Sequence, residues 1–280
     1  MRAPDACGCS SPTKFKRAYT CLETKGEQMK TFFFLLTIIM IAVPFAHAAD
    51  PSDDSLILYF SFDEIDGDMV TDHSQYGNDG TIAGAPELVA GKFGNALKLN
   101  GESDWIEVPH ADILTVDTSV TVMAWINAGR HMGPNEQRWQ GILSKGNSPR
   151  SYSFYTESPS ECLHLSAGGG SVCTGKIALN EWQHVAAQVD DGTHRYWLNG
   201  ENVGEFGGKG ALPGAADTSS VFVGKTPENN REFLGLLDEV RIWNRALNEE
   251  EIQAEMNSAA TPVEPLGKLS TTWATLKSKR

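Results

Sequence analysis

Hydrophobic and polar residues alternate with a period of two in several stretches of the chain, including residues 56–62, 120–126 and 184–189. Successive side chains of a β-strand point to opposite faces of the sheet, so this period predicts strands. In the second stretch, one predicted face holds Val120, Val122, Ala124 and Ile126, and the other holds Thr121, Met123 and Trp125.

Three turn dipeptides separate such stretches, namely Asn100-Gly101, Asp191-Gly192 and Asn199-Gly200. Asparagine, aspartate and glycine tolerate the positive φ angles that tight two-residue turns require. Each dipeptide therefore predicts a β-hairpin between the strands on either side of it.

Helical patterning is almost absent before residue 248. Asn248 is of a type that caps helix starts, and the acidic residues after it suit the positive end of a helix dipole. We therefore predict one short helix over residues 248–257. Many short strands with a single helix predict an all-β fold, a two-sheet antiparallel β-sandwich of the jelly-roll type over residues 54–258.

A hydrophobic run at residues 31–45 precedes this domain and is followed by small residues up to Ala48. A short basic start, an apolar core and small residues predict a secretory signal peptide over residues 29–48. The chain is then exported, secreted or held at the cell surface. The alternative is an uncleaved membrane anchor over residues 31–49, which is close to the length that spans a bilayer.

Two further segments flank the signal and the domain. Because a signal peptide opens a chain, residues 1–28 are predicted to be a leader of doubtful translation, with Met29 as the alternative start. Residues 259–280 are predicted to be a linker and a basic tail, because the charge changes sign there.

The chain has 280 residues, with 23 Lys and Arg against 36 Asp and Glu, and a formal charge of -13. A nucleic-acid-binding surface neutralises phosphates with basic residues, so this balance excludes that class of protein. Residues 1–48 contain more basic than acidic residues, and the exported chain is therefore more acidic than the total indicates.

Two of the five cysteines, Cys162 and Cys173, remain after residues 1–48 are removed. An even number of cysteines in an exported protein favours a disulfide. If the chain turns between Ala167 and Gly168, the two cysteines lie directly opposite each other, at a Cα separation of ~4.5–5.5 Å that suits a disulfide. Two buried free thiols are the alternative.

Six motifs follow one another along residues 54–258. They are residues 58–64 (LYFSFDE), 72–81 (DHSQYGNDGT), 92–97 (KFGNAL), 105–109 (WIEVP), 181–186 (EWQHVA) and 237–247 (LDEVRIWNRAL). In order and spacing they resemble the LamG-like jelly-roll family, within the concanavalin A-like lectin/glucanase superfamily. The resemblance implies a jelly-roll fold and a binding role, and it does not specify a ligand.

The segment 63–79 is rich in acidic residues and glycine and has no lysine or arginine. Carboxylates, amide oxygens and backbone carbonyls are the ligands that Ca²⁺ prefers. The resemblance implies a structural calcium ion where this loop meets the motif at 237–247. The ligands that it implies are Asp72, Asn78, the carbonyl of Gly80 and Asp238, with Glu64 as an additional candidate. The alternative is an acidic loop that only caps turns.

A polar loop at residues 129–139 ends in Arg138 and Trp139. An aromatic side chain with arginines beside it, on a loop, suits stacking on a sugar ring or contact with a partner. Tyr155, Asn230 and Arg231 are predicted to share this ligand-binding surface. The alternative is that Trp139 folds back and covers one end of the sandwich.

The segment 102–107 matches the pattern E-x-D-x-x-E, with which some glucanases of the same superfamily place catalytic carboxylates on one strand. Retaining hydrolysis needs two carboxyl groups about 5–5.5 Å apart. Glu102, however, directly follows the Asn100-Gly101 turn, which favours a role in the turn. We therefore predict that the protein is not an enzyme, with a glycoside hydrolase as the distant alternative.

These patterns together predict an exported, calcium-supported module that binds carbohydrate. A protein-interaction or cell-surface adhesion module is the alternative function. The predicted partner is a glycan or an extracellular protein and no nucleic acid, and the chain contacts a membrane only if residues 31–49 stay uncleaved.

Overall fold

The computed structural model describes residue 50, residues 52–147 and residues 150–258. The predicted leader, signal peptide and alternative anchor at 1–49, and the predicted basic tail at 259–280, lie outside the described residues. Within the described ranges, no helix is long and apolar enough to cross a membrane.

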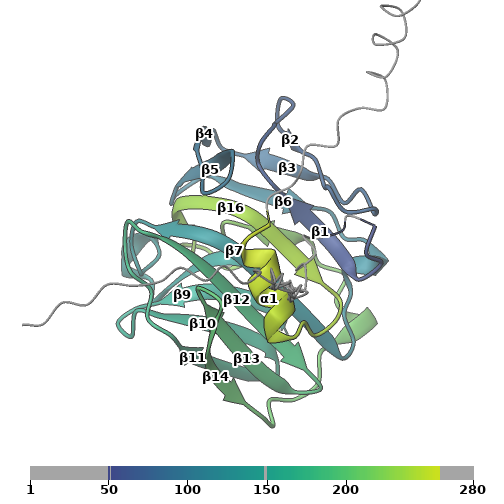
Figure 1. Ribbon diagram of the computed structural model, residues 1–280. Coiled ribbons are helices and arrows are strands. Elements are labelled where there is room, and N and C mark those ends of the chain that lie inside the picture. The colour runs from purple at the N-terminus through teal and green to yellow at the C-terminus, as the bar shows by residue number, and fades with distance from the viewer. Residues whose placement is uncertain (1–49, 51, 148–149, 259–280) are drawn as a thin grey trace, which may run out of the picture. The chain divides into compact units, whose positions relative to one another are not determined.

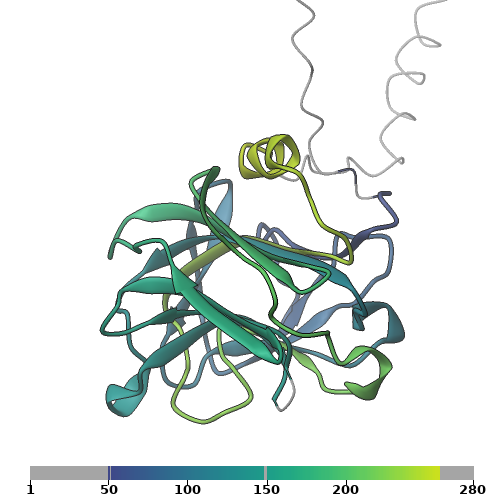
Figure 2. The ribbon, with the colours of Figure 1, turned by 90° about the horizontal axis from the view of Figure 1, so that it is seen from below.

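Two antiparallel sheets of eight strands each make up most of the described residues and form a sandwich (Figures 1 and 2). The strands of the first, sheet A, are β1 (Leu56–Phe60), β4 (Glu87–Ala90), β5 (Asn95–Asn100), β7 (Ser119–Ala128), β12 (Trp182–Asp190), β13 (Thr193–Leu198), β14 (Glu201–Phe206) and β16 (Leu234–Trp243). Their order is β14-β13-β12-β7-β16-β5-β4, and β1 pairs with the end of β16 beyond β5.

The second sheet, sheet B, has the order β11-β10-β9-β8-β15-β6-β3-β2. Its strands are β2 (Met69–Val70), β3 (Gly80–Ala83), β6 (Trp105–Val108), β8 (Trp139–Gly146), β9 (Arg150–Glu157), β10 (Cys162–Gly168), β11 (Gly170–Thr174) and β15 (Val221–Val223). Short 3-10 turns are η1 (Asp112–Leu114), η2 (Pro134–Glu136) and η3 (Gly214–Ala216). The predicted all-β, two-sheet antiparallel sandwich is confirmed.

Apolar side chains from both sheets meet between them. On β7, Val120, Val122 and Ile126 are fully buried in this core, while Met123 belongs to a second cluster on the other side of sheet A. The two faces of the strand thus match the predicted alternation. Burying one such side chain contributes about 1.5–3 kcal/mol, so the alternation decides which face of β7 packs against sheet B.

Two of the three predicted hairpins are confirmed, because Asp191-Gly192 joins β12 to β13 and Asn199-Gly200 joins β13 to β14. The prediction of a hairpin at Asn100-Gly101 is wrong, because β5 belongs to sheet A and β6 belongs to sheet B. The Asp104 carboxylate accepts hydrogen bonds from the backbone N–H groups of Asn100 and Ala85, each at 3.0 Å. These bonds hold the turn in a form that carries the chain from one sheet to the other.

One α-helix, α1 (Glu249–Met256), follows β16 and lies on the outer face of sheet A (Figures 1 and 2). The Asn248 side chain accepts from the Glu251 N–H, and the Glu251 carboxylate accepts from the Asn248 N–H, which forms a capping box. The Trp125 indole N–H donates to the Met256 carbonyl at 3.1 Å and fixes the last turn to β7. The predicted short helix at 248–257 is confirmed.

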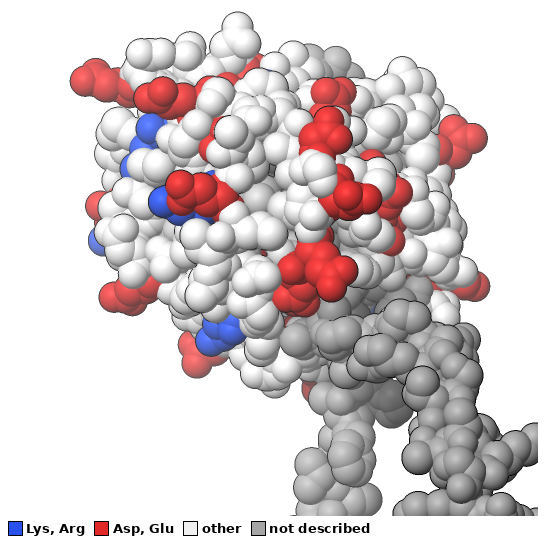
Figure 3. All heavy atoms as spheres, turned by 90° about the horizontal axis from the view of Figure 1, so that it is seen from above, with Lys and Arg blue, Asp and Glu red and all other residues white. Residues whose placement is uncertain are grey.

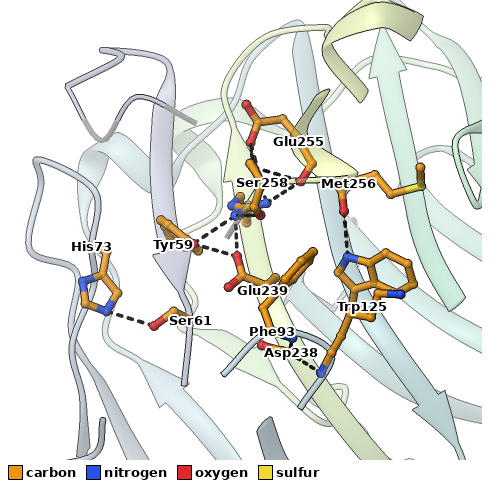
Figure 4. A network of polar contacts seen from close by, with 12 residues as sticks. Tyr59, Ser61, His73, Phe93, Trp125, Asp238, Glu239, Glu255, Met256 and Ser258 are labelled. Carbon is orange, nitrogen blue, oxygen red and sulfur yellow. Dashed lines mark hydrogen bonds and ion pairs between the residues drawn. The ribbon is translucent and has the colours of Figure 1, made fainter. Parts of the chain in front are cut away.

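A buried polar network joins β1, β16 and the residues that end α1 (Figure 4). The guanidinium of Arg241, on β16, is its centre and is 1% exposed. It donates to the Tyr59 hydroxyl and the Ser258 carbonyl at 2.9 Å each, to the Glu255 carbonyl at 3.0 Å, and to the Glu239 carboxylate. The network holds the C-terminal end of α1 on the sandwich.

Candidate functional site

The acidic loop between β1 and β3 is organised around Asp72, which is 5% exposed. Its Oδ1 accepts from the N–H groups of Tyr59 at 2.8 Å and Ser74 at 2.9 Å. Its Oδ2 accepts from the Ser74 hydroxyl at 2.6 Å and the Asn78 N–H at 2.8 Å. Both carboxylate oxygens of this predicted calcium ligand therefore serve to close the loop.

The other predicted calcium ligands of this loop lie around Asp72. The Asn78 side-chain amide donates to the Ile57 carbonyl at 2.9 Å, Gly80 is buried at the start of β3, and Glu64 is exposed. The ligand atoms of Asp72, Glu64 and Asp238 do not all lie within 4.8 Å of one another. The structure thus brings Asp72 and Asn78 together and leaves Glu64 at the surface.

Asp238 lies on β16 with no exposed area, beside the turn between β4 and β5 (Figure 4). Its Oδ2 accepts from the N–H groups of Lys92 at 2.8 Å and Phe93 at 2.9 Å. Its Oδ1 is buried and makes no hydrogen bond of normal geometry. Burial raises the pKa of Asp238 to about 7, and the two N–H donors offset only part of that effect.

Asp63, which follows β1, contacts the same turn between β4 and β5, and the sequence motifs did not single it out as a ligand. The Asp63 Oδ1 accepts from the Asn95 N–H at 3.0 Å. A Cβ atom on Gly94 would collide with this oxygen, and one on Gly91 would lie 2.7 Å from the Asp238 Oδ2. Two glycines therefore let two carboxylates approach one turn, a signal that is visible in the sequence as the Gly91 to Gly94 spacing.

The oxygen atoms at this turn are of the chemical type that binds calcium. Asp63, Asp238 and the carbonyls of a glycine-rich turn are hard oxygen ligands. A buried carboxylate oxygen without a donor, as at Asp238, is costly unless a cation or a proton balances its charge. Figure 3 shows that acidic side chains outnumber basic ones on the face of the molecule at the top of Figure 1, which raises the local cation concentration.

The predicted ligand-binding residues meet on the outer face of sheet B. The rings of Trp139 on β8 and Tyr155 on β9 have centroids 6.3 Å apart at 69°. The guanidinium of Arg231 lies 4.6 Å above the Trp139 ring and that of Arg138 lies 5.4 Å from it. Tyr155 also stacks on His164 at 4.8 Å. Four of the five predicted residues therefore form one cluster.

Ion pairs hold the arginines of this cluster in place. Arg231 pairs with Glu228 at 3.0 Å, and Arg138 pairs with the buried Glu157. The Arg231 side chain is 15% exposed, whereas that of Arg138 is 55% exposed. Trp139 is partly buried beneath the guanidinium groups. This agrees better with the alternative in which Trp139 covers part of the sandwich than with a ring that is open for stacking.

Two hollows open beside this cluster, between loops from distant parts of the chain. The first has a volume of 590 Å³ and is lined by Glu102, Pro134, Asn135, Asn229, Asn230 and Glu232. The second has a volume of 410 Å³ and is lined by Met132, Glu136, Arg138, Ser158 and Pro159. Asn230 lies in the first and Arg138 in the second, while Glu102, Asn135, Asn229 and Glu232 are lining residues that the sequence patterns did not assign to ligand binding.

Backbone and side-chain contacts fix the loops at residues 133–137 and 229–232, which supply most of the lining of the first hollow. The Asn135 amide donates to the Asn230 amide oxygen at 2.8 Å, and the Gly141 N–H donates to the Arg231 carbonyl at 2.7 Å. A Cβ atom on Gly133 would collide with the carbonyls of Asn230 and Trp139. The loops therefore touch main chain to main chain, and the amide side chains are held at the rim.

The E-x-D-x-x-E motif is distributed over three different settings. Glu102 is exposed and lines the first hollow. Asp104 is 2% exposed and accepts from two backbone N–H groups in the crossing turn. Glu107 is exposed on β6, where it accepts from the Ser220 hydroxyl at 2.8 Å. The motif thus supplies one carboxylate to the hollow, and its Asp104 stabilises the turn.

The Cys162–Cys173 disulfide is present, with a Cα–Cα distance of 5.7 Å. The predicted register of the two cysteines is wrong, because Cys173 lies opposite His164. The turn falls at Gly168 and Gly169, one residue later than predicted, because Gly168 adopts the positive φ of 56°. The disulfide therefore runs diagonally across the β10–β11 hairpin.

The sheet order, the register and the loops define a concanavalin A-like β-sandwich. Residues 100–253 match the family described as the Concanavalin A-like lectin/glucanases superfamily, and the chain therefore belongs to this superfamily. This confirms the family to which the six motifs point.

Solved structures with this fold include a domain of an arabinanase and a botulinum neurotoxin. Domain 4 of the extracellular arabinanase AbnA from Geobacillus stearothermophilus, in complex with arabinotriose, has a TM-score of 0.59 at 20% identity and covers 72% of this chain and 98% of its own. A botulinum neurotoxin type C structure, whose cell entry depends on two ganglioside molecules, has a TM-score of 0.56 at 15% identity and covers 73% of this chain and 51% of its own. At these identities the likeness shows the fold alone.

A curated relative is Adhesion G-protein coupled receptor V1 of Danio rerio, which is 26% identical over 134 residues. The match covers 42% of this chain and 2% of the receptor, so the chain spans a small part of that relative.

Proposed function

We propose that this chain is an exported, calcium-supported module that binds carbohydrate in the first hollow. The observation that carries this proposal is the lining of that hollow, where three asparagine amides and two glutamates surround a space of 590 Å³. Amides both donate and accept, and carboxylates accept strongly, so together they suit the adjacent hydroxyl groups of a sugar.

The comparisons support carbohydrate over other small ligands. The arabinanase domain was solved with arabinotriose, and the neurotoxin structure concerns gangliosides. The adhesion receptor relative supports a protein partner as the second candidate. The predicted signal peptide and the Cys162–Cys173 disulfide support export, because disulfides persist in oxidising compartments.

Replacing Asn230 by alanine is expected to weaken glycan binding about five- to tenfold, which is the loss of one or two neutral hydrogen bonds. The measurement is a glycan array followed by calorimetry with the glycan that binds best. The matched control is Asn244→Ala, since Asn244 is an exposed amide at the far end of β16.

Unchanged affinity in Asn230→Ala would remove the first hollow as the binding site. If no glycan binds and an extracellular protein does, the adhesion interpretation replaces ours. Release of sugar products that Glu102→Gln abolishes would instead establish the hydrolase.

Calcium is expected to raise the melting temperature, and EDTA is expected to lower it, because a ligand bound only by the folded state stabilises it. The gain is about 2.7 kcal/mol at a calcium concentration one hundred times the Kd. Asp238→Asn is expected to remove this shift and the calorimetric calcium signal. Asp72→Asn distinguishes two sites: it keeps the shift if calcium binds at the β4–β5 turn, and loses the shift if Asp72 is a ligand. A melting temperature that changes neither with calcium nor with EDTA would contradict the proposed metal site.

A further inference from the structure

Four side chains with metal-ligand chemistry meet on the outer face of sheet B, away from the predicted calcium ligands. Glu157 on β9 lies opposite Cys162 on β10, and His164 on β10 lies opposite Cys173 on β11. Because residues two apart on a strand share a face, this register gathers all four on one side of three neighbouring strands. The ligand atoms of Glu157, His164 and Cys173 all lie within 4.8 Å of one another.

The distances place the Glu157 Oε2 at the centre of this cluster. It lies 2.6 Å from the Cys173 Sγ, 3.3 Å from the Cys162 Sγ and 3.7 Å from the His164 Nδ1. The Glu157 side chain is 1% exposed and that of His164 is 12% exposed, and the His164 Nδ1 makes no hydrogen bond. A disulfide sulfur carries no hydrogen to donate, so in the oxidised protein neither sulfur satisfies this carboxylate oxygen.

We propose that the disulfide masks a zinc site, and that Cys162, Cys173, His164 and Glu157 bind one Zn²⁺ when the disulfide is reduced. A phosphine or dithiol reductant supplies two electrons, the S–S bond breaks, and two protons yield two thiols. The reductant becomes a phosphine oxide, with an oxygen from water, or a disulfide. Zinc then displaces both thiol protons to solvent and forms two Zn–S bonds, one Zn–N bond and one Zn–O bond.

Two of the contacts in this cluster already have the spacing of a tetrahedral zinc site. Zn–S bonds of ~2.3 Å and Zn–N or Zn–O bonds of ~2.0–2.2 Å separate neighbouring ligand atoms by roughly 3.3–3.8 Å. The contacts of the Glu157 Oε2 with Cys162 and His164, at 3.3 and 3.7 Å, already have this length, and the contact with Cys173 must lengthen by about 1 Å. Zinc replaces one cross-link between β10 and β11 by another.

The charges of the site also balance. Two thiolates and one carboxylate face the two positive charges of zinc, and Arg138 pairs with the other oxygen of Glu157. Thiolate and imidazole ligands select zinc over calcium, which prefers oxygen alone. The proposed site is therefore chemically distinct from the calcium turn, and it does not depend on the carbohydrate function.

The test compares oxidised and phosphine-reduced full-length protein after equilibration with zinc and desalting. Reduction is expected to raise bound zinc from about zero to about one per chain by elemental analysis. With Co²⁺ as the probe, the reduced protein is expected to show thiolate charge-transfer and tetrahedral ligand-field bands that the oxidised protein lacks. His164→Gln and Glu157→Gln are each expected to weaken zinc binding at least tenfold, whereas the exposed-histidine control His73→Gln keeps it.

Equal zinc in the oxidised and reduced proteins would overturn the proposal, and so would reduced protein that binds none. Zinc binding that survives in both His164→Gln and Glu157→Gln would overturn it too, because the two cysteines alone would then explain the metal. If one variant fails to fold, the other still decides whether a residue besides the two cysteines binds the metal.

Discussion

Replacing Arg241 by methionine is expected to lower the free energy of unfolding by about 3–5 kcal/mol, the usual cost of removing one partner from a buried ion pair. Arg241 is 1% exposed, and its guanidinium lies 4.3 Å from the centre of the Tyr59 ring. Methionine keeps much of the side-chain volume but donates no hydrogen bond. The carbonyls of Glu255 and Ser258 and the carboxylate of Glu239 then lose a donor inside the protein.

Urea unfolding at pH 7 measures this effect. The double variant Arg241→Met with Glu239→Gln is the control, because removing both charges restores part of the lost stability if the cost comes from an unpaired buried carboxylate. A single variant that loses less than about 1 kcal/mol would show that water reaches the network and replaces the guanidinium.

Acidification from pH 6.5 to pH 4 is expected to destabilise the protein through its buried histidines. Burial lowers the pKa of His184 to about 3 and that of His194 to about 4, and nearby positive charges add to both effects. In the unfolded chain both titrate near ~6.5. Below that pH the unfolded state binds protons and the folded state does not. The contribution of the two histidines to the free energy of unfolding is therefore complete above pH ~6.5 and is lost as the pH falls toward the folded pKa values.

The variant His184→Leu removes the proton uptake of one of these two histidines and leaves that of the other. Neither ring nitrogen of His184 has a hydrogen-bond partner, and the ring contacts Trp125 at 5.5 Å, so leucine removes no hydrogen bond there. Between pH 6 and pH 4, the free energy of unfolding of His184→Leu is expected to fall less steeply than that of the wild-type protein. The difference in slope is about 1.4 kcal/mol per pH unit. The raised pKa of Asp238 acts in the opposite direction in calcium-free protein, and it cancels in the comparison of the two proteins. Parallel urea midpoints for both proteins across this range would contradict the assignment.

The fold followed from short-range patterns, and the errors occurred at turns, whose direction and position these patterns leave open. Alternation on β7 predicts which side chains face the core, because burial acts on each strand separately. The turn at Asn100-Gly101 has hairpin chemistry, yet the Asp104 carboxylate redirects the chain into the other sheet. The register of Cys162 and Cys173 changes when the turn moves by one residue, and the positive φ of Gly168 sets the position of that turn.

The candidate sites were predictable to different extents. Trp139 and Tyr155 were grouped by their chemistry, and the strand pairing of β8 with β9 brings them together. The Glu157 contact with the disulfide could not be foreseen, because it depends on the register of three strands. The pairing of Asp63 with the turn that contacts Asp238 likewise requires β1, β5 and β16 to be placed in space.

The direction of β16 determines how the domain presents its hollow. Leu234 begins the strand beside Glu232, which lines the first hollow, and Trp243 ends it near the Asp53 to Arg245 ion pair. A ten-residue strand is roughly 30 Å long. The start of the described domain, near Asp53, therefore lies about one strand length from the hollow. Protein immobilised near Asp53 should therefore present the hollow to solution, where a glycan can reach it.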